Sequence, residues 1–262
     1  MITDSHTHLY WKSFDEDRDE VLARARAAGI DRMIVVGTDL ETSRAALALA
    51  HRERGILASV GIHPNDLGGP DDPGPSPETL AAIAELARDP KCVAIGETGL
   101  DFYWDSVAKE RQIEGFRWHL ELSSATGKPV IIHSRDAHQE TVRVLSEDLA
   151  PSGPGGVMHC FTMGAEELVD YAKLDLYISF SGVVTFKKND ANRQAAKATR
   201  AERLLVETDC PFLAPQHKRG KRNEPSFITG VIECVAQQRG MTTGEIEELT
   251  TNNAARLFGF TD

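Results

Sequence analysis

A pair of histidines near the N-terminus is the first feature of the sequence that could do chemistry. In Asp4-Ser5-His6-Thr7-His8 the histidines stand two positions apart, so on an extended strand both imidazoles point to the same side and can share one metal ion. In an arbitrary strand such a pair is more often incidental than a metal site. Whether this pair binds metal therefore depends on which residues stand at the ends of the other expected strands.

Ionisable residues recur at or just beyond the ends of the expected strands. Histidines and two carboxylates stand there: His6, His8, His63, His133, His159, Glu97 and Asp209. Taken singly, each has a simpler interpretation, because a lone histidine is commonly a hydrogen-bonded core residue and Glu97 could cap a helix. If parallel strands bring four of these histidines and the two carboxylates to one end of a barrel, a cation is needed to neutralise and order them. We therefore predict a metal centre.

The number of donors predicts more than one ion. The expected ligands are His6, His8, Glu97, His133, His159 and Asp209. They exceed what one tetrahedral ion needs, so two divalent ions that share a bridging carboxylate are expected, with Glu97 as the bridge. Imidazole and carboxylate together suit zinc, manganese, iron or magnesium, and the sequence does not select among them.

Short apolar runs that alternate with longer amphipathic stretches are the elements that must position these residues. Strands are expected at Ile2–His8, Met33–Gly37, Ile56–Ile62, Cys92–Glu97, Val130–His133, Val157–Cys160, Leu176–Ser181 and Leu204–Asp209. Helical patterns between them include Asp15–Ala28, Leu40–Arg54, Pro77–Arg88, Ser106–Thr126 and Ala165–Leu174, with a final pair after Pro225 and after Thr242.

This alternation predicts one α/β domain over residues 1–262, a (β/α)8 TIM barrel in which outer helices surround a parallel eight-stranded barrel. The runs are nearly continuously apolar, as strands covered on both faces require. An open doubly wound sheet is the alternative. Against it, no G-x-G-x-x-G follows the first expected strand.

The composition limits the class of protein. The net charge of -11 argues against strong nonspecific binding to nucleic acid, so such a role needs a local basic patch. The four cysteines lie far apart without a C-x-x-C pair, which favours a reducing compartment. The sequence has no apolar run of membrane-spanning length, and Met1-Ile2-Thr3-Asp4 is not a basic and apolar leader. We expect a cytoplasmic protein that does not enter a membrane.

Ordered motifs along almost the whole chain resemble the TatD family of metal-dependent hydrolases, within the amidohydrolase-like metal barrels. The matching motifs are Asp4-Ser5-His6-Thr7-His8-Leu9, Gly61-Ile62-His63-Pro64, Gly96-Glu97-Thr98-Gly99-Leu100-Asp101, His133-Ser134-Arg135-Asp136-Ala137, His159-Cys160-Phe161, Glu207-Thr208-Asp209, Arg219-Gly220-Lys221-Arg222-Asn223-Glu224-Pro225 and Asn253-Ala254-Ala255-Arg256-Leu257-Phe258. The resemblance implies a (β/α)8 barrel, a divalent metal centre and hydrolysis of phosphodiester bonds in DNA, usually from an end.

The resemblance also implies roles for single residues. The six expected ligands match the family's metal ligands, and His63 and Glu207 match active-site residues outside that set. The chain departs from the family's usual residues at Tyr10, Trp104, His119 and Cys210. Trp104 stands where arginine is common, which could change how substrate is held.

Glu207 and Asp209 are two residues apart and should face one side of their strand. Asp209 could then bind metal and accept a proton from the attacking water, while Glu207 makes a supporting hydrogen bond. A structural ion pair with an arginine is the alternative for Glu207.

Basic side chains that could bind phosphate groups of the substrate are expected in two places. The segment His217–Arg222 follows the eighth expected strand, where barrels often bind phosphate, and supplies Lys221 and Arg222. Arg135, two residues after His133, could hold phosphate oxygens in a bidentate way. The alternative is that this run of charged residues only forms a solvent-exposed surface, as such runs usually do.

Three consecutive aromatic residues, Phe102-Tyr103-Trp104, follow Glu97 in a loop. Such residues more often pack down than stack on bases, and stacking is the secondary interpretation.

These observations predict a metal-dependent deoxyribonuclease of the TatD type, an exonuclease in which a two-metal-activated water cleaves single-stranded DNA or DNA ends. No obligate protein partner is evident. An ester or amide hydrolase on the same barrel, such as an aminoacyl-tRNA deacylase or a lactonase, is the alternative enzyme. A noncatalytic metal- or phosphate-binding regulator would have lost ligands, and the sequence lacks none of them.

Overall fold

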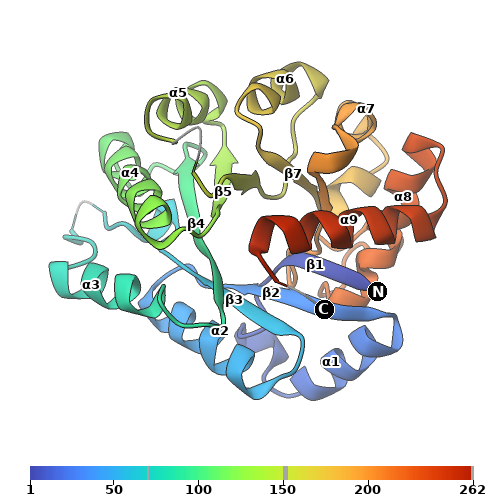
Figure 1. The fold of residues 1–262 in the computed structure, drawn as a ribbon, viewed down its shortest axis with the longest axis horizontal. Coiled ribbons are helices and arrows are strands. Elements are labelled where there is room, and N and C mark those ends of the chain that lie inside the picture. The colour runs from blue at the N-terminus through green and yellow to red at the C-terminus, as the bar shows by residue number, and fades with distance from the viewer. Residues whose placement is uncertain (70, 150–152, 261–262) are drawn as a thin grey trace. The chain divides into compact units, whose positions relative to one another are not determined.

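Two compact units make up the computed structural model, which describes residues 1–69, 71–149 and 153–260. One unit consists of Met1–Val35 and His159–Asp262, and the other of Val36–Met158. The parallel strands follow one another in chain order within one sheet (Figure 1): β1 Ile2–Thr7, β2 Ile30–Val36, β3 Ile56–Val60, β4 Cys92–Asp101, β5 Val130–Arg135, β6 Gly156–Met158, β7 Tyr177–Phe180 and β8 Leu204–Val206. This order confirms the predicted (β/α)8 class, while the single domain over 1–262 stays a prediction.

The terminal unit contains β1, β7, β8 and most of β2. Its helices are α1 Arg18–Ala27, α6 Ala165–Lys173, α7 Asp190–Ala198, α8 Ile228–Arg239 and α9 Thr243–Phe258. Helix α9 packs against β1 and β8 (Figure 1). Asn253 donates from Nδ2 to the carbonyls of Ala201 and Leu204, and the N–H of Thr3 donates to Thr251. The last helix thereby holds the start of β1, which carries His6, and of β8, which leads to Glu207 and Asp209.

The central unit contains β3 to β6 and the α-helices α2 Leu40–Arg52, α3 Pro77–Leu86, α4 Lys109–Thr126 and α5 His138–Asp148. Helix α2 begins at a capping box in which Asp39 and Thr42 bond to each other's backbone N–H. Helix α3 begins after Ser76 with proline at its first position. Among the described residues, short 3-10 helices are found at Lys12–Phe14, Pro64–Asp66, Gly182–Thr185, Ala201–Arg203, Gln216–Lys218 and Pro225–Phe227.

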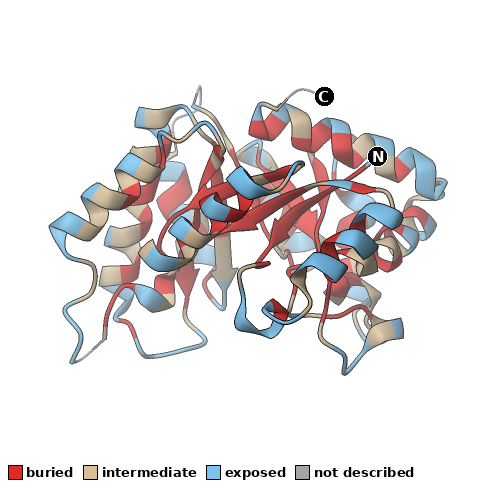
Figure 2. Cartoon of the chain, turned by 90° about the horizontal axis from the view of Figure 1, so that it is seen from below, coloured by how far each residue is buried: buried red, intermediate tan, exposed pale blue. Residues whose placement is uncertain are grey.

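The strands are buried along almost their whole length, as Figure 2 shows. Every residue of β1, β7 and β8 is buried, including polar ones. This confirms the prediction of strands covered on both faces, which follows from their nearly continuous apolar runs.

The strands end at other residues than predicted, and two of these differences change the argument for residues of the site. Strand β4 continues past Glu97 to Asp101, because it pairs with β5 up to Arg135 across an irregularity between Ile95 and Thr98. Strand β8 ends at Val206, and the N–H of Thr208 donates to the side chain of Asp4 instead of a neighbouring strand. Glu207 and Asp209 therefore lie beyond the strand, so the argument from strand alternation does not apply to them.

In the described part of the chain, none of the helices is both long enough and apolar enough to cross a membrane.

Candidate metal centre

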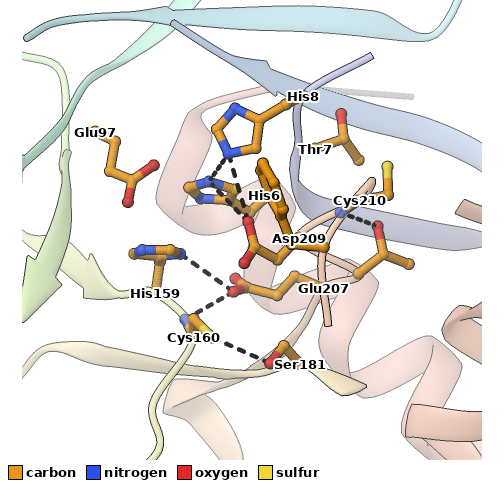
Figure 3. Close-up of polar contacts among 12 residues, drawn as sticks. His6, Thr7, His8, Glu97, His159, Cys160, Ser181, Glu207, Asp209 and Cys210 are labelled. Carbon is orange, nitrogen blue, oxygen red and sulfur yellow. Dashed lines mark hydrogen bonds and ion pairs between the residues drawn. The ribbon is translucent and has the colours of Figure 1, made fainter. Parts of the chain in front are cut away.

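Five predicted site residues lie together at the ends of β1 and β8 and after β6: His6, His8, His159, Glu207 and Asp209, here called the β1–β8 group. The Nε2 atoms of His6 and His8 are 3.1 Å apart. Oδ1 of Asp209 lies 3.7 Å from Nε2 of His6 and 3.4 Å from Nε2 of His8 (Figure 3). The two imidazoles therefore point to one place, as the spacing predicts, and a carboxylate faces them there.

The backbone of Asp209 is in the left-handed region, with φ 57°. Its N–H donates to the carbonyl of His6, and its own carbonyl accepts from Phe212. A non-glycine residue keeps this conformation only where its surroundings impose it, and such residues cluster at functional sites. The turn directs the carboxylate of Asp209 toward the histidines.

Electrostatics favour a charged Asp209. Burial alone would raise the pKa of its carboxyl group, but His8, His6 and His159 hold the pKa below its ordinary value. Asp209 is therefore an anion at neutral pH, as a metal ligand or proton acceptor must be.

Glu207 organises the segment that carries His159. Its Oε1 accepts the N–H of Cys160 at 2.7 Å and lies 3.3 Å from Nδ1 of His159 (Figure 3). The imidazole of His159 is stacked on that of His6 with ring centroids 4.1 Å apart. Within the described residues Glu207 meets Ser5, Cys160 and His159 and no arginine, which favours a supporting role in the site over a structural ion pair.

Asp4 is a buried residue of the site to which sequence reasoning gave no role. Its carboxylate accepts from N–H and Oγ1 of Thr208, at 2.9 and 2.6 Å, and from N–H of His6 at 3.3 Å. Burial raises the pKa of Asp4 to about 8 even though the Thr208 bonds lower it. Asp4 joins the backbones that carry His6 and Asp209, and its place two residues before His6 was the available signal.

A second group lies in the central unit and consists of His63, Glu97, Asp101 and His133, here called the β3–β5 group. Oε1 of Glu97 lies 2.9 Å from Nδ1 of His133 and 3.6 Å from Nε2 of His63. Nδ1 of His63 accepts the N–H of Asn65 at 3.1 Å. That bond turns Nε2 of His63 toward Glu97.

A glycine before Glu97 makes its position possible. Gly96 has φ 116°, and a Cβ there would lie 2.5 Å from the carbonyl oxygen of Ile131. The register irregularity between β4 and β5 falls at this place. Bulges of this kind redirect side chains next to active sites, and only glycine fits this one.

Asp101 was part of a motif without an assigned role, and the structure gives it one. Its Oδ2 lies 3.3 Å from Nε2 of His133 and accepts Nδ2 of Asn65 at 3.1 Å. Burial alone would raise the pKa of Asp101, but His133 and Asn65 lower it to about 2. A constant negative charge therefore faces the ring of His133.

The donors present fit divalent ions. The potential ligand atoms of His6, His159 and Glu207 lie within 4.8 Å of one another, and so do those of His63, Glu97 and His133. Imidazole nitrogens and carboxylate oxygens suit zinc, manganese or iron, and magnesium where oxygens predominate. His63 and Glu207, which were expected outside the ligand set, lie as close as the expected ligands.

The basic residues that were predicted to bind phosphate differ in their surroundings. Arg135 is exposed at the end of β5, and its guanidinium lies 3.7 Å from the ring centroid of Tyr103. Lys221 is exposed. Arg222 instead donates to both carboxylate oxygens of Asp17, at 2.8 and 2.6 Å, and to the carbonyl of Ser13.

The eight β/α units and the histidine–carboxylate groups at the strand ends define a metal-dependent hydrolase. Residues 3–259 match the model of the TatD related DNase family, and the chain belongs to this family.

Three relatives illustrate the family. The chain is 43% identical over 258 residues to an uncharacterized metal-dependent hydrolase, YabD, of Bacillus subtilis, with 98% of this chain and 99% of that protein covered. It is 37% identical to a protein named 3'-5' ssDNA/RNA exonuclease TatD from Klebsiella pneumoniae, with 98% and 97% covered. The crystal structure of the TatD homolog YjjV from Escherichia coli K12 has a TM-score of 0.92 and 29% identity, with 99% and 98% covered.

Proposed function

We propose that this hydrolase cleaves phosphodiester bonds of single-stranded DNA, or of DNA ends, from a chain end. The observation that carries the proposal is the convergence of His6, His8 and Asp209 on one place, because such a donor set holds a cation where a phosphate must be neutralised. Relatives named as single-strand exonucleases support this substrate class.

Two divalent ions are proposed as cofactors. In the β1–β8 group the ligands would be His6, His8, His159 and Asp209, and in the β3–β5 group His133 and Glu97. As the sequence predicts, Glu97 would be the carboxylate shared by both ions. When bound, the ions supply an activated water, polarise the phosphoryl oxygen and stabilise the leaving oxygen.

The protein's own groups position the reaction and move protons. Asp209 is charged at neutral pH and accepts the proton of the attacking water at a carboxylate oxygen. Glu207 orients His159 through its contact with Nδ1, and Asp101 orients His133 through Nε2. His63, held by Asn65, lies beside Glu97, where it can donate a hydrogen bond to substrate oxygens.

Cations outside the metal groups would hold the other phosphates of the strand. Arg135 and Lys221 are exposed and available for this role. Arg222 was predicted to share it, but a phosphate there would compete with Asp17 for the guanidinium. We propose that Arg222 contributes to this site mainly by holding the segment in place.

A substrate panel tests the proposal. The metal-stripped protein is supplied with magnesium, manganese or zinc in turn and offered end-labelled single-stranded DNA, RNA, an aminoacyl ester and a lactone. We expect metal-dependent, stepwise shortening of the DNA. Cleavage of the ester or lactone with no shortening of DNA would contradict the proposal and favour the ester or amide hydrolase.

A further inference from the structure

Two large aromatic side chains are exposed in the loop that follows β4. Tyr103 and Trp104 are 52% and 53% exposed, and their rings are perpendicular with centroids 4.8 Å apart. Phe102, in contrast, is half-buried and has the ammonium group of Lys109 4.3 Å from its ring. The expectation that all three pack down therefore fails for the last two.

A cation accompanies the exposed rings. The guanidinium of Arg135 lies 3.7 Å from the ring centroid of Tyr103 and 6.0 Å from that of Trp104. Stacking on Tyr103 orients the planar guanidinium and leaves its N–H edge available for an anion. The cluster thus combines an aromatic surface with one fixed positive charge.

The loop is held to the β3–β5 group by several bonds. Oδ1 of Asp101 accepts the N–H of Tyr103 at 3.0 Å, while Oδ2 of the same carboxylate faces His133. Gln112 bonds to both backbone groups of Asp101 and to the carbonyl of Val107. These bonds connect the start of the aromatic loop to the carboxylate that faces His133.

Arg135 and His133 are two residues apart on β5, so their side chains leave the same face of the strand. An anion bound by Arg135 would consequently lie on the side where His133 faces Glu97 and Asp101. A nucleotide has the complementary parts, a flat base and a phosphate.

We propose that Tyr103, Trp104 and Arg135 form a nucleotide platform, on which an unpaired base stacks against Trp104 while Arg135 binds a phosphate next to that base. This proposal rests on the proposed function and adds the contact that holds the strand beside the β3–β5 group. Base stacking does not distinguish the sugar, so the platform accepts DNA and RNA strands alike. A base paired inside a duplex cannot reach it, which selects single strands and frayed ends.

The first test separates the π-face of Trp104 from its bulk. Trp104→Leu keeps an apolar side chain without a ring, whereas Trp104→Phe keeps a ring. On a short single-stranded DNA, Trp104→Leu in the metal-loaded enzyme should raise KM about tenfold or more with kcat changed by only a few-fold, and Trp104→Phe should stay within a few-fold of wild type. Equal KM values for wild type and Trp104→Leu would overturn the platform.

Strands with a single abasic position identify the stacked base. For wild type, one abasic position should raise KM by about the same factor as Trp104→Leu, and in Trp104→Leu that position should no longer matter. If Trp104→Leu raises KM equally for every strand, including the abasic ones, the substitution disturbs the loop and the stacking proposal is wrong.

A binding signal separates failure of the platform from failure of the proposed function. In a Trp11→Phe, Trp118→Phe background Trp104 is the remaining tryptophan, and stopped-flow mixing of the holoenzyme with a strand should quench its fluorescence before cleavage. An abasic strand should quench it much less. If the enzyme cleaves no strand, the proposed function fails, and base-dependent quenching then decides the platform alone: its presence supports the platform and its absence overturns it.

Discussion

Nε2 of His133 lies 3.3 Å from Oδ2 of Asp101, while the other imidazole nitrogen of His133 lies 2.9 Å from Glu97. The imidazole thus stands between two carboxylates, one predicted to bind metal and one that also anchors the aromatic loop. Such outer carboxylates fix the orientation of a neighbouring histidine and increase its basicity.

Asp101→Asn should reduce metal affinity or kcat by about 10- to 100-fold without unfolding the protein, because the charge that orients His133 is lost. Titration calorimetry of the stripped protein with manganese measures the affinity, and circular dichroism checks the fold. Asp105→Asn is the matched control, since Asp105 is exposed in the same loop. Equal metal affinity and kcat for Asp101→Asn and wild type would show that Asp101 serves only the loop.

Asp209→Asn should lower kcat at least ~100-fold, because asparagine keeps the shape but loses the charge and the proton acceptor. With saturating metal the bound strand should still be retained, so KM should change little. Steady-state kinetics on end-labelled single-stranded DNA measure both constants. Turnover within a few-fold of wild type would show that another group accepts the proton.

His119 should make stability depend on pH. Its Nδ1–H donates to the carbonyl of Gly115 at 2.7 Å and its Nε2 accepts the N–H of Ile62 at 2.9 Å, so the buried ring is neutral. Burial lowers the pKa of His119 from 6.5 to about 4. As pH falls below 6.5 the unfolded chain takes up the proton first, so the stability that His119 provides is complete above pH 6.5 and is lost progressively down to about pH 4.

The gap between 6.5 and about 4 corresponds to a loss of about 3 kcal/mol in the free energy of unfolding. Urea unfolding at pH 7.5 and at pH 4.5 measures it, with His119→Gln as the comparison, since an amide oxygen can accept the N–H of Ile62 without titrating. If wild type and His119→Gln lose the same stability on acidification, His119 is not responsible.

Lys221→Ala and Arg222→Ala should have different effects. Lys221→Ala should raise KM for single-stranded DNA and flatten the plot of log affinity against log salt by about 0.7, as expected for one lost phosphate contact. Arg222→Ala should lower the free energy of unfolding by about 1 kcal/mol, because the paired guanidinium and Asp17 are only part-buried.

Salt-dependent binding and urea unfolding of both variants provide the two measurements. A salt slope that changes in Arg222→Ala but not in Lys221→Ala would reverse the assignment of the two cations.

Much of this molecule could be predicted from the sequence, because apolar runs of strand length and histidines at their ends are local patterns. The spacing of two predicts that His6 and His8 point the same way, and their Nε2 atoms meet as expected although His8 lies just beyond the end of β1. Glu207 and Asp209 come close to the histidines for another reason, namely a left-handed turn after β8 that no alternation rule contains.

The residues that were missed act through long-range contacts. Asp4 and Thr208 are far apart in the chain, and so are Asp101 and His133, so neither pairing has a local signature. The partner of Arg222 is likewise an aspartate near the other end of the chain. A basic run therefore indicates available charge, while the fold decides which cations are already paired.

The proposal of a two-metal hydrolase is tested most directly by measuring bound metal and hydrolysis of one defined single-stranded DNA on the same samples. The protein is stripped exhaustively, manganese is added in increments, and bound metal and the rate of strand shortening are recorded together. We predict no turnover in excess chelator, binding of two ions per chain, and a rate that returns only as the second ion binds. Full turnover of the stripped protein in excess chelator, or maximal turnover with one bound ion, would contradict a two-metal hydrolase.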